Sequence, residues 1–595
     1  MDASKYGTRI VTLAAVLELG VALFDVVAGG FDVTLGGIRI SSRHALRPFS
    51  IGVISASLAV WLHDRGSVGT SVAWLRSRAR YIVIGVAIAT FLAGILFGTR
   101  VAGGADSYGY VSEAFLWAKG NLVVPEPMAT IDPVVSPAAA PLGYRPGTSG
   151  TIVPIYPPGY PMVMGAASLI GGANAMYFVV PVFGALAVWL TYWLGSRISD
   201  PLVGLSAAIV FACSPIFVFQ LFVPMSDVPV TAWWLLAIAC SIAGLKRSTV
   251  LAGLSAGAAV LTRPNLVPLT TVVAALVWLG SVPADEERSR FRRLAAFSAG
   301  FVPACVAVAI IDNALYGSPL LSGYGALDTL FRPEWIRVNL SHYPLWLIQV
   351  HSAGILLAGA APFMFARTRP SETHARWHFR ITLLLLSFCV MVLLCYISYV
   401  PMNGWPFVRF LLPAIPILFI LASDVALRAL AFAPLSLRGA TLIATVGLVA
   451  GAYLARADRL GAFATAANEN RFVAVGASVG AELPPNAVVL SGMHSGSFRM
   501  YGRRPTLRWD QIGRDDLDAA IQVMSARAFE LFVLLESDEE PFFRERFSPS
   551  SEAGKLDWTP RFVYPGPPTV RVYAVADQAR RDLDVVTRVI SIGQR

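Results

Sequence analysis

Charged residues are scarce in this sequence, and their scarcity excludes an ordinary soluble protein. Only 14% of the 595 residues are Asp, Glu, Lys or Arg, whereas 55% are hydrophobic. A soluble domain carries about a quarter charged residues. Apolar runs of about 18–22 residues recur along most of the chain, and each is long enough to cross a hydrocarbon core of about 30 Å. The sequence therefore predicts a polytopic α-helical membrane protein.

Cysteine and lysine are also rare, and an internal repeat is missing. All five cysteines lie inside apolar runs without metal-ligand spacing, which excludes cysteine chemistry as the function. Lysine is rare beside arginine, a bias typical of a GC-rich bacterial genome. No repeat of fixed period is visible, which disfavours transporters built from repeated halves.

The net charge of +10 comes from basic residues grouped between the apolar runs. This pattern indicates membrane topology rather than nucleic-acid binding, so no nucleic-acid partner is expected. The densest early group, residues 63–80, holds four arginines and is predicted to be cytoplasmic. The basic segments 245–248, 287–293 and 366–380 fall on the same side of the alternation. The chain after residue 97 is therefore predicted to be extracytoplasmic, at a bacterial plasma membrane.

About thirteen apolar segments are predicted to span the membrane, and the first is expected to be a retained span rather than a cleaved signal. They are residues 10–28, 49–62, 81–97, 175–194, 203–223, 228–245, 250–261, 266–279, 294–315, 345–365, 381–399, 411–427 and 440–454. Residues 31–48 are expected to form a small surface hairpin. The run 160–170 is too short to cross and is expected to lie along the outer interface.

The composition changes after Arg456. Short β-like runs (NAVVLSG, FELFVLL and TVRVYAV) alternate there with helical stretches such as RDDLDAAIQVMSARA. We therefore divide the chain into a transmembrane domain, residues 1–456, with an outer loop at about 98–174, and a soluble extracytoplasmic α/β domain, residues 457–595.

The outer loop begins with GTRVAGGADSYGYVSEAFLWAKGNL, in which Asp106 is the first carboxylate after the third predicted span. Loops longer than about 15 residues are usually functional or disordered, and the aromatic residues of this one, including Tyr144 and Tyr156, argue for order. Asp106 has two interpretations, a chemical group or an N-cap of the helix that follows it. Glu113, two turns later, is expected to face solvent.

Several segments in order resemble the GT-C superfamily, membrane glycosyltransferases that use polyprenyl-phosphate sugars. This group includes protein O-mannosyltransferases and lipid A aminoarabinose transferases. The segments that carry the resemblance are GADSYGYVSEAFLWAKGNL, GYRPGTSGTIVPIYPPGYP, SPIFVFQLFVPMSDVP, AGLSAGAAVLTRPNLVPL and NGWPFVRFLLPAIPIL. The tail segment SGMHSGSFRMYGRRPTLRWD is similar to extracytoplasmic tails of bacterial members.

The resemblance implies that Asp106 is a general base, which removes a proton from an acceptor hydroxyl or amine as it attacks the anomeric carbon of a polyprenyl-phosphate sugar. Such assistance contributes about 10²–10⁴ in rate. The single displacement would invert the anomer. Arginine suits the departing phosphate because its planar fork binds phosphate oxygens. The predicted substrate-binding residues are Tyr144, Arg145, Tyr156, Asp227, Arg263 and Arg409.

Alternatives stay open for several of these residues. An interfacial arginine often only snorkels to lipid headgroups, and Asp227 has the sequence context of a helix cap. No metal-binding motif is visible, although the resemblance leaves a divalent cation open, and no organic cofactor is expected. The expected partners are the lipid-linked donor, an acceptor lipid, glycan or protein, and membrane lipids. The competing functions are a flippase or transporter of lipid-linked glycans and a non-catalytic envelope assembly protein.

Overall fold

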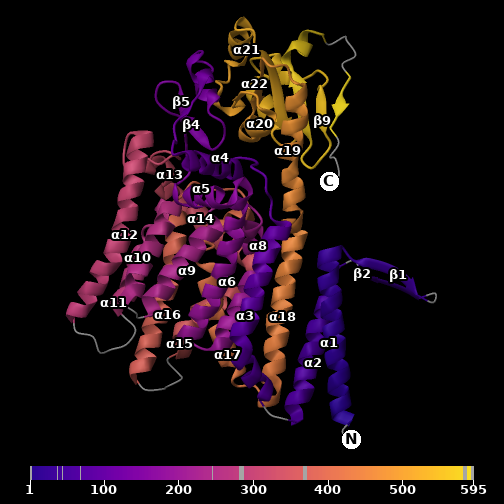
Figure 1. Ribbon diagram of the computed structural model, residues 1–595, viewed down its shortest axis with the longest axis vertical. Helices are drawn as coiled ribbons and strands as arrows, with labels where there is room; N and C mark the ends of the chain where they lie inside the picture. The colour runs from indigo at the N-terminus through magenta and orange to yellow at the C-terminus, as the bar shows by residue number, and fades with distance from the viewer. Residues whose placement is uncertain are drawn as a thin grey trace.

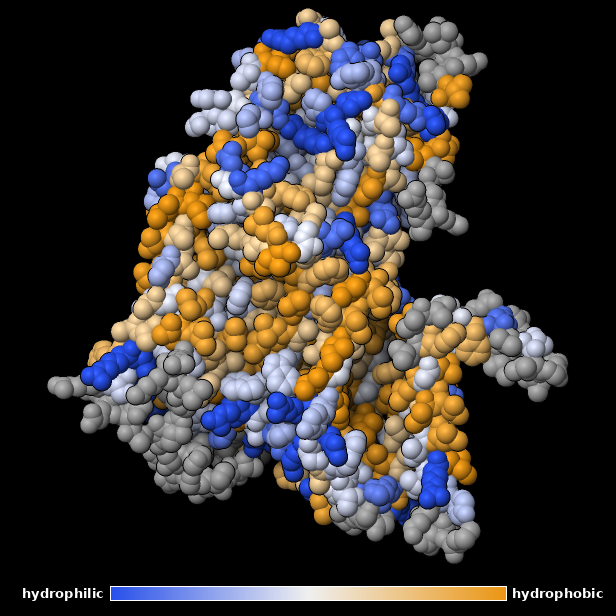
Figure 2. Space-filling model, viewed as in Figure 1, coloured by the Kyte–Doolittle hydropathy of each residue, from blue (hydrophilic) through white to orange (hydrophobic). Residues whose placement is uncertain are grey.

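The computed structural model describes residues 3–35, 38–42, 44–66, 69–243, 246–279, 287–365, 372–580 and 586–590. The chain forms a bundle of helices with a β-rich layer at one end (Figure 1). The surface of the bundle carries a broad hydrophobic band with hydrophilic residues above and below it (Figure 2). Such a band matches the hydrocarbon region of a bilayer, so the fold is that of a polytopic helical membrane protein.

Helices occupy every segment that was predicted to span, but the predicted count of about thirteen is not confirmed. In the part of the chain that the structure describes, six helices are long and apolar enough to cross, or nine if each of three bent pairs is one span. The shortfall comes from short helices such as α9 (Asp227–Ala243), α10 (Lys246–Thr262) and α11 (Leu269–Leu279). A helix of 17 residues extends about 26 Å, less than the hydrocarbon thickness.

The remaining bundle helices overlap the predicted segments, and most of them begin several residues earlier than predicted. They are α1 (Ala3–Ala28), α2 (Leu46–Gly66), α3 (Thr70–Phe97), α6 (Val179–Ile198), α12 (Glu287–Tyr316), α16 (Glu372–Ile397) and α18 (Leu435–Arg459). The predicted surface hairpin is confirmed as β1 (Phe31–Leu35) paired antiparallel with β2 (Ile38–Ser42). Of the predicted cytoplasmic basic segments, parts of 63–80, 245–248 and 366–380 lie outside the described residues.

Three pairs of apolar helices are bent at short breaks. The pairs are α7 (Pro201–Ala212) with α8 (Pro215–Leu221), at 62°; η5 (Pro333–Trp335) and α14 (Ile336–His351) with η6 (Ala353–Ala360) and α15 (Ala361–Phe365), at 109°; and η7 (Trp405–Leu411) with α17 (Ile415–Leu430), at 83°. Proline opens α8 and lies in the first turn of α17, just after two of the breaks, where it cannot continue a preceding helix. Two of the breaks lie side by side, because the Ser214 hydroxyl is 2.8 Å from Nε2 of His351.

Two short helices lie across the end of the bundle that is next to the β-rich layer (Figure 1). We call this end the α4 face. The two helices are α4 (Asp106–Lys119) and α5 (Gly159–Gly171), and α5 is the short run that was predicted to lie along the interface. Between them a three-stranded antiparallel sheet has the order β3-β5-β4. Its strands are β3 (Val124–Pro125), β4 (Tyr144–Pro146) and β5 (Thr151–Pro154), with the 3₁₀ turns η1 (Pro127–Thr130) and η2 (Ser136–Ala139) before β4.

The tail that follows α18 forms the outermost layer, and its sheet contains the predicted strands. The sheet has the order β11-β9-β10-β8-β6-β7 and mixes parallel and antiparallel pairs. Its strands are β6 (Ala487–Ser491), β7 (Thr506–Leu507), β8 (Glu530–Glu536), β9 (Phe562–Tyr564), β10 (Val570–Ala574) and β11 (Arg588–Val589). The helices packed with it are α19 (Thr465–Glu482), α20 (Ser495–Gly502), α21 (Leu517–Ala526) and α22 (Glu540–Phe547).

The apolar cores join the outer loop to both of its neighbours. Tyr108 and Tyr144 belong to the same buried cluster as the bundle helices. Met128 and Val135 instead pack into a core with Val488 and Leu490 of the tail strand β6. The loop is therefore held between the bundle and the tail.

Candidate active site

Asp106 is the first residue of α4, and its carboxylate does not cap that helix. The N-cap residue is Ala105, and no side-chain cap hydrogen bond is present among the described residues. The capping interpretation is therefore wrong. Oδ1 of Asp106 accepts from the Tyr156 hydroxyl at 2.7 Å, and Oδ2 accepts from Nη2 of Arg409 at 2.9 Å. The Asp106 side chain is 33% exposed, so its carboxylate is accessible from outside the protein.

Two glycines allow Tyr156 to reach Asp106. A Cβ on Gly109, one turn into α4, would lie 2.0 Å from Cε2 of Tyr156. A Cβ on Gly143 would lie 2.8 Å from the Cα of Gly109, and Gly143 has a φ of +86°. Because glycine has no Cβ, α4 and the strands beside it can approach closely here.

The second ion pair lies beside the first. Nη2 of Arg263 donates to Oδ1 of Asp227 at 2.8 Å, and the Asp227 side chain is fully buried. Oδ2 of Asp227 has no hydrogen-bond partner among the described residues. Arg263 follows α10, and Asp227 begins α9, so the pair joins two short apolar helices at the α4 face.

The two ion pairs share neighbours and form one cluster. The guanidinium groups of Arg263 and Arg409 each lie 5.4 Å from the ring centre of Phe410. Nη1 of Arg409 lies 3.2 Å from the sulfur of Met225, and Nε of Arg263 donates to the Ser226 hydroxyl at 3.2 Å. Five predicted site residues therefore meet in the structure: Asp106, Tyr156, Asp227, Arg263 and Arg409.

The electrostatics of the cluster keep Asp106 ionised. Burial acts to raise the pKa of the Asp106 carboxyl, but the charge of Arg409 and the hydrogen bond from Tyr156 outweigh it. The pKa of Asp106 is therefore lowered from its ordinary value. Asp106 also raises the pKa of the Tyr156 hydroxyl, after burial, which is the larger cause. Tyr156 consequently stays protonated and acts as a hydrogen-bond donor.

Two predicted residues, Tyr144 and Arg145, lie beside the cluster without contacting Asp106 directly. The Tyr144 hydroxyl donates to the Ser112 hydroxyl at 2.9 Å. Nη1 of Arg145 donates to the backbone oxygen of Ser322 at 3.3 Å, and its guanidinium lies 5.4 Å from the ring centre of Tyr316. Both side chains come from β4, next to the strand that leads to Tyr156.

Glu113 corrects another prediction, because it is 1% exposed rather than facing solvent. Nε1 of Trp117 donates to one carboxylate oxygen of Glu113 at 3.1 Å, and the other oxygen has no partner among the described residues. Burial raises the pKa of Glu113 well above its ordinary value. The helix α4 packs against α5 at this end of the bundle, and a helical pattern alone does not show which of its sides are covered.

Several residues of the cluster were not predicted. The Tyr110 hydroxyl lies 2.8 Å from that of Ser226, and Nη1 of Arg263 donates to the Tyr396 hydroxyl at 3.2 Å. The ring of Tyr324 packs edge-on against Tyr156, 5.8 Å between centres. Tyr110 and Ser226 adjoin predicted residues along the chain or helix, whereas Tyr396 lies in an apolar run without a distinguishing signal. Among the described residues, no group of three or more His, Cys, Asp or Glu is placed to hold a metal ion.

Comparison with solved structures identifies the fold. The chain superposes on ArnT from Cupriavidus metallidurans bound to undecaprenyl phosphate, with a TM-score of 0.51 and 14% identity, over 84% of this chain and 98% of that chain. It superposes on the Archaeoglobus fulgidus oligosaccharyltransferase in the apo form, with a TM-score of 0.51 and 12% identity, over 83% of this chain and 74% of that chain. The chain has the GT-C fold.

No protein-family model and no curated protein sequence matches the chain, so the comparison of tertiary structures is what confirms the GT-C fold that the sequence segments predicted. Identities of 12–14% establish the GT-C fold and nothing finer. The chemistry of the site must therefore be argued from the cluster around Asp106.

Proposed function

We propose that this protein is a glycosyltransferase that moves a sugar from a polyprenyl-phosphate donor to an acceptor hydroxyl or amine. We place the reaction at the outer face of a bacterial plasma membrane. The single observation that carries the proposal is the contact of Asp106 with Arg409, beside the Arg263–Asp227 pair, at one end of a GT-C bundle. It combines a base with two phosphate-binding groups.

In the proposed reaction the acceptor oxygen or nitrogen attacks the anomeric carbon of the sugar. The bond between that carbon and the phosphate oxygen breaks, its electron pair leaves with the polyprenyl phosphate, and Asp106 takes the acceptor proton. One displacement inverts the anomer. The leaving phosphate gains negative charge, which Arg409 and Arg263 are placed to stabilise.

The balance of charge supports this assignment. Two arginines and two aspartates make the cluster neutral before the donor arrives. The donor phosphodiester brings one negative charge, which competes with Asp106 for the guanidinium of Arg409. Because that guanidinium lowers the pKa of Asp106, sharing it with phosphate would raise the pKa. Donor binding would thus make Asp106 a stronger base at the moment when a base is needed.

Other features support the donor class and the remaining substrate contacts. The ArnT structure that this chain resembles is bound to undecaprenyl phosphate, which supports a polyprenyl-phosphate donor. We assign Tyr144 and Arg145 to the sugar or acceptor because they line the same outer loop as Tyr156. The two arginines supply positive charge at the leaving group, and the reaction needs no organic cofactor.

A flippase or transporter of lipid-linked glycans is the competing function. Transporters place ionisable residues along a pathway through the membrane. Here the two ion pairs collect at the α4 face, where α4 begins nine residues after the span α3 ends. This concentration supports an enzyme. A non-catalytic assembly protein would not require the carboxylate of Asp106.

The decisive experiment compares Asp106→Asn with Asp132→Asn. Purified protein in lipid nanodiscs would receive radiolabelled polyprenyl-phosphate sugars and an envelope fraction from cells that lack the protein, and release of free polyprenyl phosphate would be measured. We expect D106N to lose at least about 10²-fold in rate, the typical contribution of a general base. D132N is the matched control because, within the described part of the chain, the Asp132 side chain accepts only from the Val134 amide, which asparagine can also do.

Transfer by D106N within about threefold of the parent would remove the base from the mechanism. In sealed proteoliposomes, movement of the labelled lipid from one leaflet to the other by both proteins, without release of polyprenyl phosphate, would indicate a flippase instead.

A further inference from the structure

The chain segment that leads to Asp106 is held by the tail. Residues 99–105 connect α3 to α4, and the amide of Ala102 donates to the Tyr501 hydroxyl at 2.9 Å. A Cβ on Gly103 would lie 2.3 Å from Cδ2 of Phe472 and 2.5 Å from Oε2 of Glu469. Three side chains of α19 and α20, the two tail helices that face the bundle, therefore touch this connection.

This contact reaches the first turn of α4. The amide of Tyr108 donates to the backbone oxygen of Gly103 at 3.2 Å, across the position of Asp106. Gly104 has a φ of +55°, a left-handed conformation that favours glycine. A shift of Gly103 would therefore tilt the turn that carries the Asp106 carboxylate.

A second contact holds the same turn from the side. A Cβ on Gly496 in α20 would lie 2.1 Å from Cδ1 of Tyr108 in α4. The neighbouring Ser495 hydroxyl accepts from the amide of Leu142 at 3.1 Å, which ties α20 to the chain just before β4. The tail thus approaches Asp106 from two directions.

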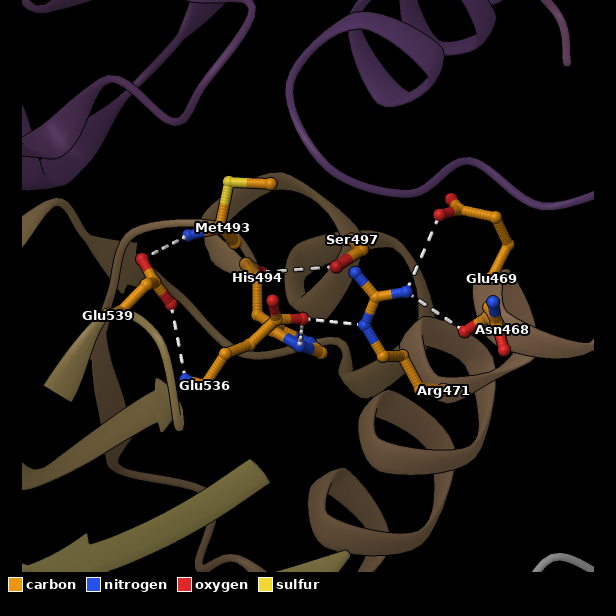
Figure 3. Close-up of polar contacts among 8 residues, drawn as sticks. All are labelled: Asn468, Glu469, Arg471, Met493, His494, Ser497, Glu536 and Glu539. Atoms are coloured by element: carbon orange, nitrogen blue, oxygen red, sulfur yellow. Dashed lines mark hydrogen bonds and ion pairs between the residues drawn. The ribbon is translucent and has the colours of Figure 1, made fainter. Parts of the chain in front are cut away.

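The tail surface behind these contacts is braced by a buried polar network (Figure 3). Nε of Arg471 donates to Oε1 of Glu536 at 2.6 Å, and Nε2 of His494 lies 3.0 Å from the same oxygen. Glu539 accepts from the amide of Met493 at 2.9 Å. These contacts join α19, β8 and the start of α20 through one shared carboxylate, although Nδ1 of the buried His494 has no hydrogen-bond partner among the described residues.

We propose that Tyr501, Phe472 and Gly496 are positioning residues for Asp106, so that the tail is a working part of the active site. The inference rests on the proposed glycosyl transfer, and none of the three residues needs to touch substrate. The Tyr501 hydroxyl holds the segment 99–105 by accepting from the Ala102 amide, and the Phe472 ring packs against Gly103. Gly496 leaves room for the Tyr108 ring because it has no side chain. The fold thereby uses a separate layer to orient a base at the end of the bundle.

The first test is Tyr501→Phe, which keeps the ring and removes the hydroxyl. Its matched control is Tyr573→Phe, which removes a tail hydroxyl that contacts Glu540 instead. We expect Y501F to lower kcat roughly 3–10-fold, the usual value of one hydrogen bond, with the KM for the donor and the melting temperature unchanged. Y573F should keep the parental kcat.

The second test uses the close contact at Gly103. Gly103→Ala places a methyl group against the Phe472 ring and should lower kcat more than Y501F does. The second close atom, Oε2 of Glu469, is the far end of a flexible side chain and can turn aside, so the Phe472 ring is the main obstacle to the methyl group. Adding Phe472→Leu removes the clashing ring atoms but also the support that the ring gives, so the double variant should recover kcat at least about fivefold over G103A alone while staying below the parent. Simple loss of folding would not be reversed by a second truncation in a buried layer, so failure of this recovery would contradict the proposed contact.

Hydrogen exchange gives a readout that needs no transfer activity. Y501F should speed deuterium uptake in the peptide covering 99–108, because the Ala102 amide loses its acceptor, and unchanged uptake would overturn the contact. Parental kcat in Y501F and G103A, with D106N inactive, would overturn the positioning role and leave the proposed function standing. Full activity in D106N would overturn the proposed function and, with it, the positioning role.

Discussion

Asp106 is held by one charged and one neutral partner, and each has a different consequence. The Arg409 contact lowers the pKa of Asp106 and neutralises it. The Tyr156 contact fixes the direction of the carboxylate without changing the net charge. With 33% of its side chain exposed, Asp106 can still meet a substrate that arrives from outside the protein. An aspartate used as a base needs both properties, a defined orientation and access.

Removing Arg409 should change the pH dependence of transfer. Asp106 acts as a base only when ionised, so the rate falls as the pH drops through its pKa. Because Arg409 lowers that pKa, Arg409→Gln should raise it, and the acid limb of kcat/KM should move to higher pH. Tyr156→Phe should shift the limb in the same direction by less.

The pH profiles of both variants would be measured between about pH 4 and 8, the range in which carboxyl and imidazole groups titrate. Arg332→Gln is the control and should leave the limb in place, because the half-exposed Arg332 side chain contacts Asp328, Glu334 and Trp335 and, within the described ranges, no residue of the cluster. An acid limb that is identical in R409Q and the parent would assign it to a group other than Asp106.

The helix α4 packs closely against the ring of Tyr156, the residue that donates to Asp106. Its one interior glycine, Gly109, lies against the Tyr156 ring, and Gly143 lies against Gly109 in turn. Glycine in a helix costs about 1 kcal/mol relative to alanine, so the residue is unfavourable for the helix itself. Close approach of the tyrosine explains its presence.

Gly109→Ala should therefore lower activity without lowering the stability of α4. The methyl group would lie 2.0 Å from the Tyr156 ring, and either the ring or the helix must move. We expect at least about a tenfold loss of kcat, since small misplacements of reacting groups are costly. Gly85→Ala is the control, because nothing lies within 4 Å of a Cβ there. Equal activity of both variants would contradict the close packing of Tyr156 on α4.

The outer loop and the tail behave as one packed unit. Arg499 of α20 forms an ion pair with Glu126 and donates to the backbone oxygen of Ala139 at 2.6 Å. Met128 and Val135 share a core with the tail strands. The tail therefore covers apolar loop residues that would otherwise face water, and its removal would leave them exposed.

Arg499→Ala should destabilise the packing of the tail against the outer loop. Removing one partner of a mostly buried ion pair typically costs about 3–5 kcal/mol, because the remaining charge is left without compensation. Arg527→Ala is the matched control, since Arg527 also donates to the loop, to the oxygen of Ile131, but from an exposed position. Its effect should stay below about 1 kcal/mol. Pulse proteolysis of the tail in urea would measure the free energy of unfolding of both variants. Equal losses of that free energy would contradict a stabilising ion pair between Arg499 and Glu126.

Local patterns predicted some of these features and missed others. The helical segments, the surface hairpin and the tail strands follow from hydrophobic period and length, and they were found. The capping role of Asp106 and the solvent exposure of Glu113 were wrong, because each depends on what packs against α4. The span count was not confirmed, because α9, α10 and α11 are shorter than the hydrocarbon thickness requires.

The amino-acid sequence by itself determined a membrane-embedded helical bundle with a β-containing tail, because charge density and the length of apolar runs are local quantities. Only the tertiary structure decided that Arg409 meets Asp106, since 303 residues separate them along the chain. It alone decided that Phe472 and Tyr501 of the tail support the segment before that aspartate. Which side chains share a site depends on how the helices and layers pack together, and hydrophobic period leaves that arrangement open.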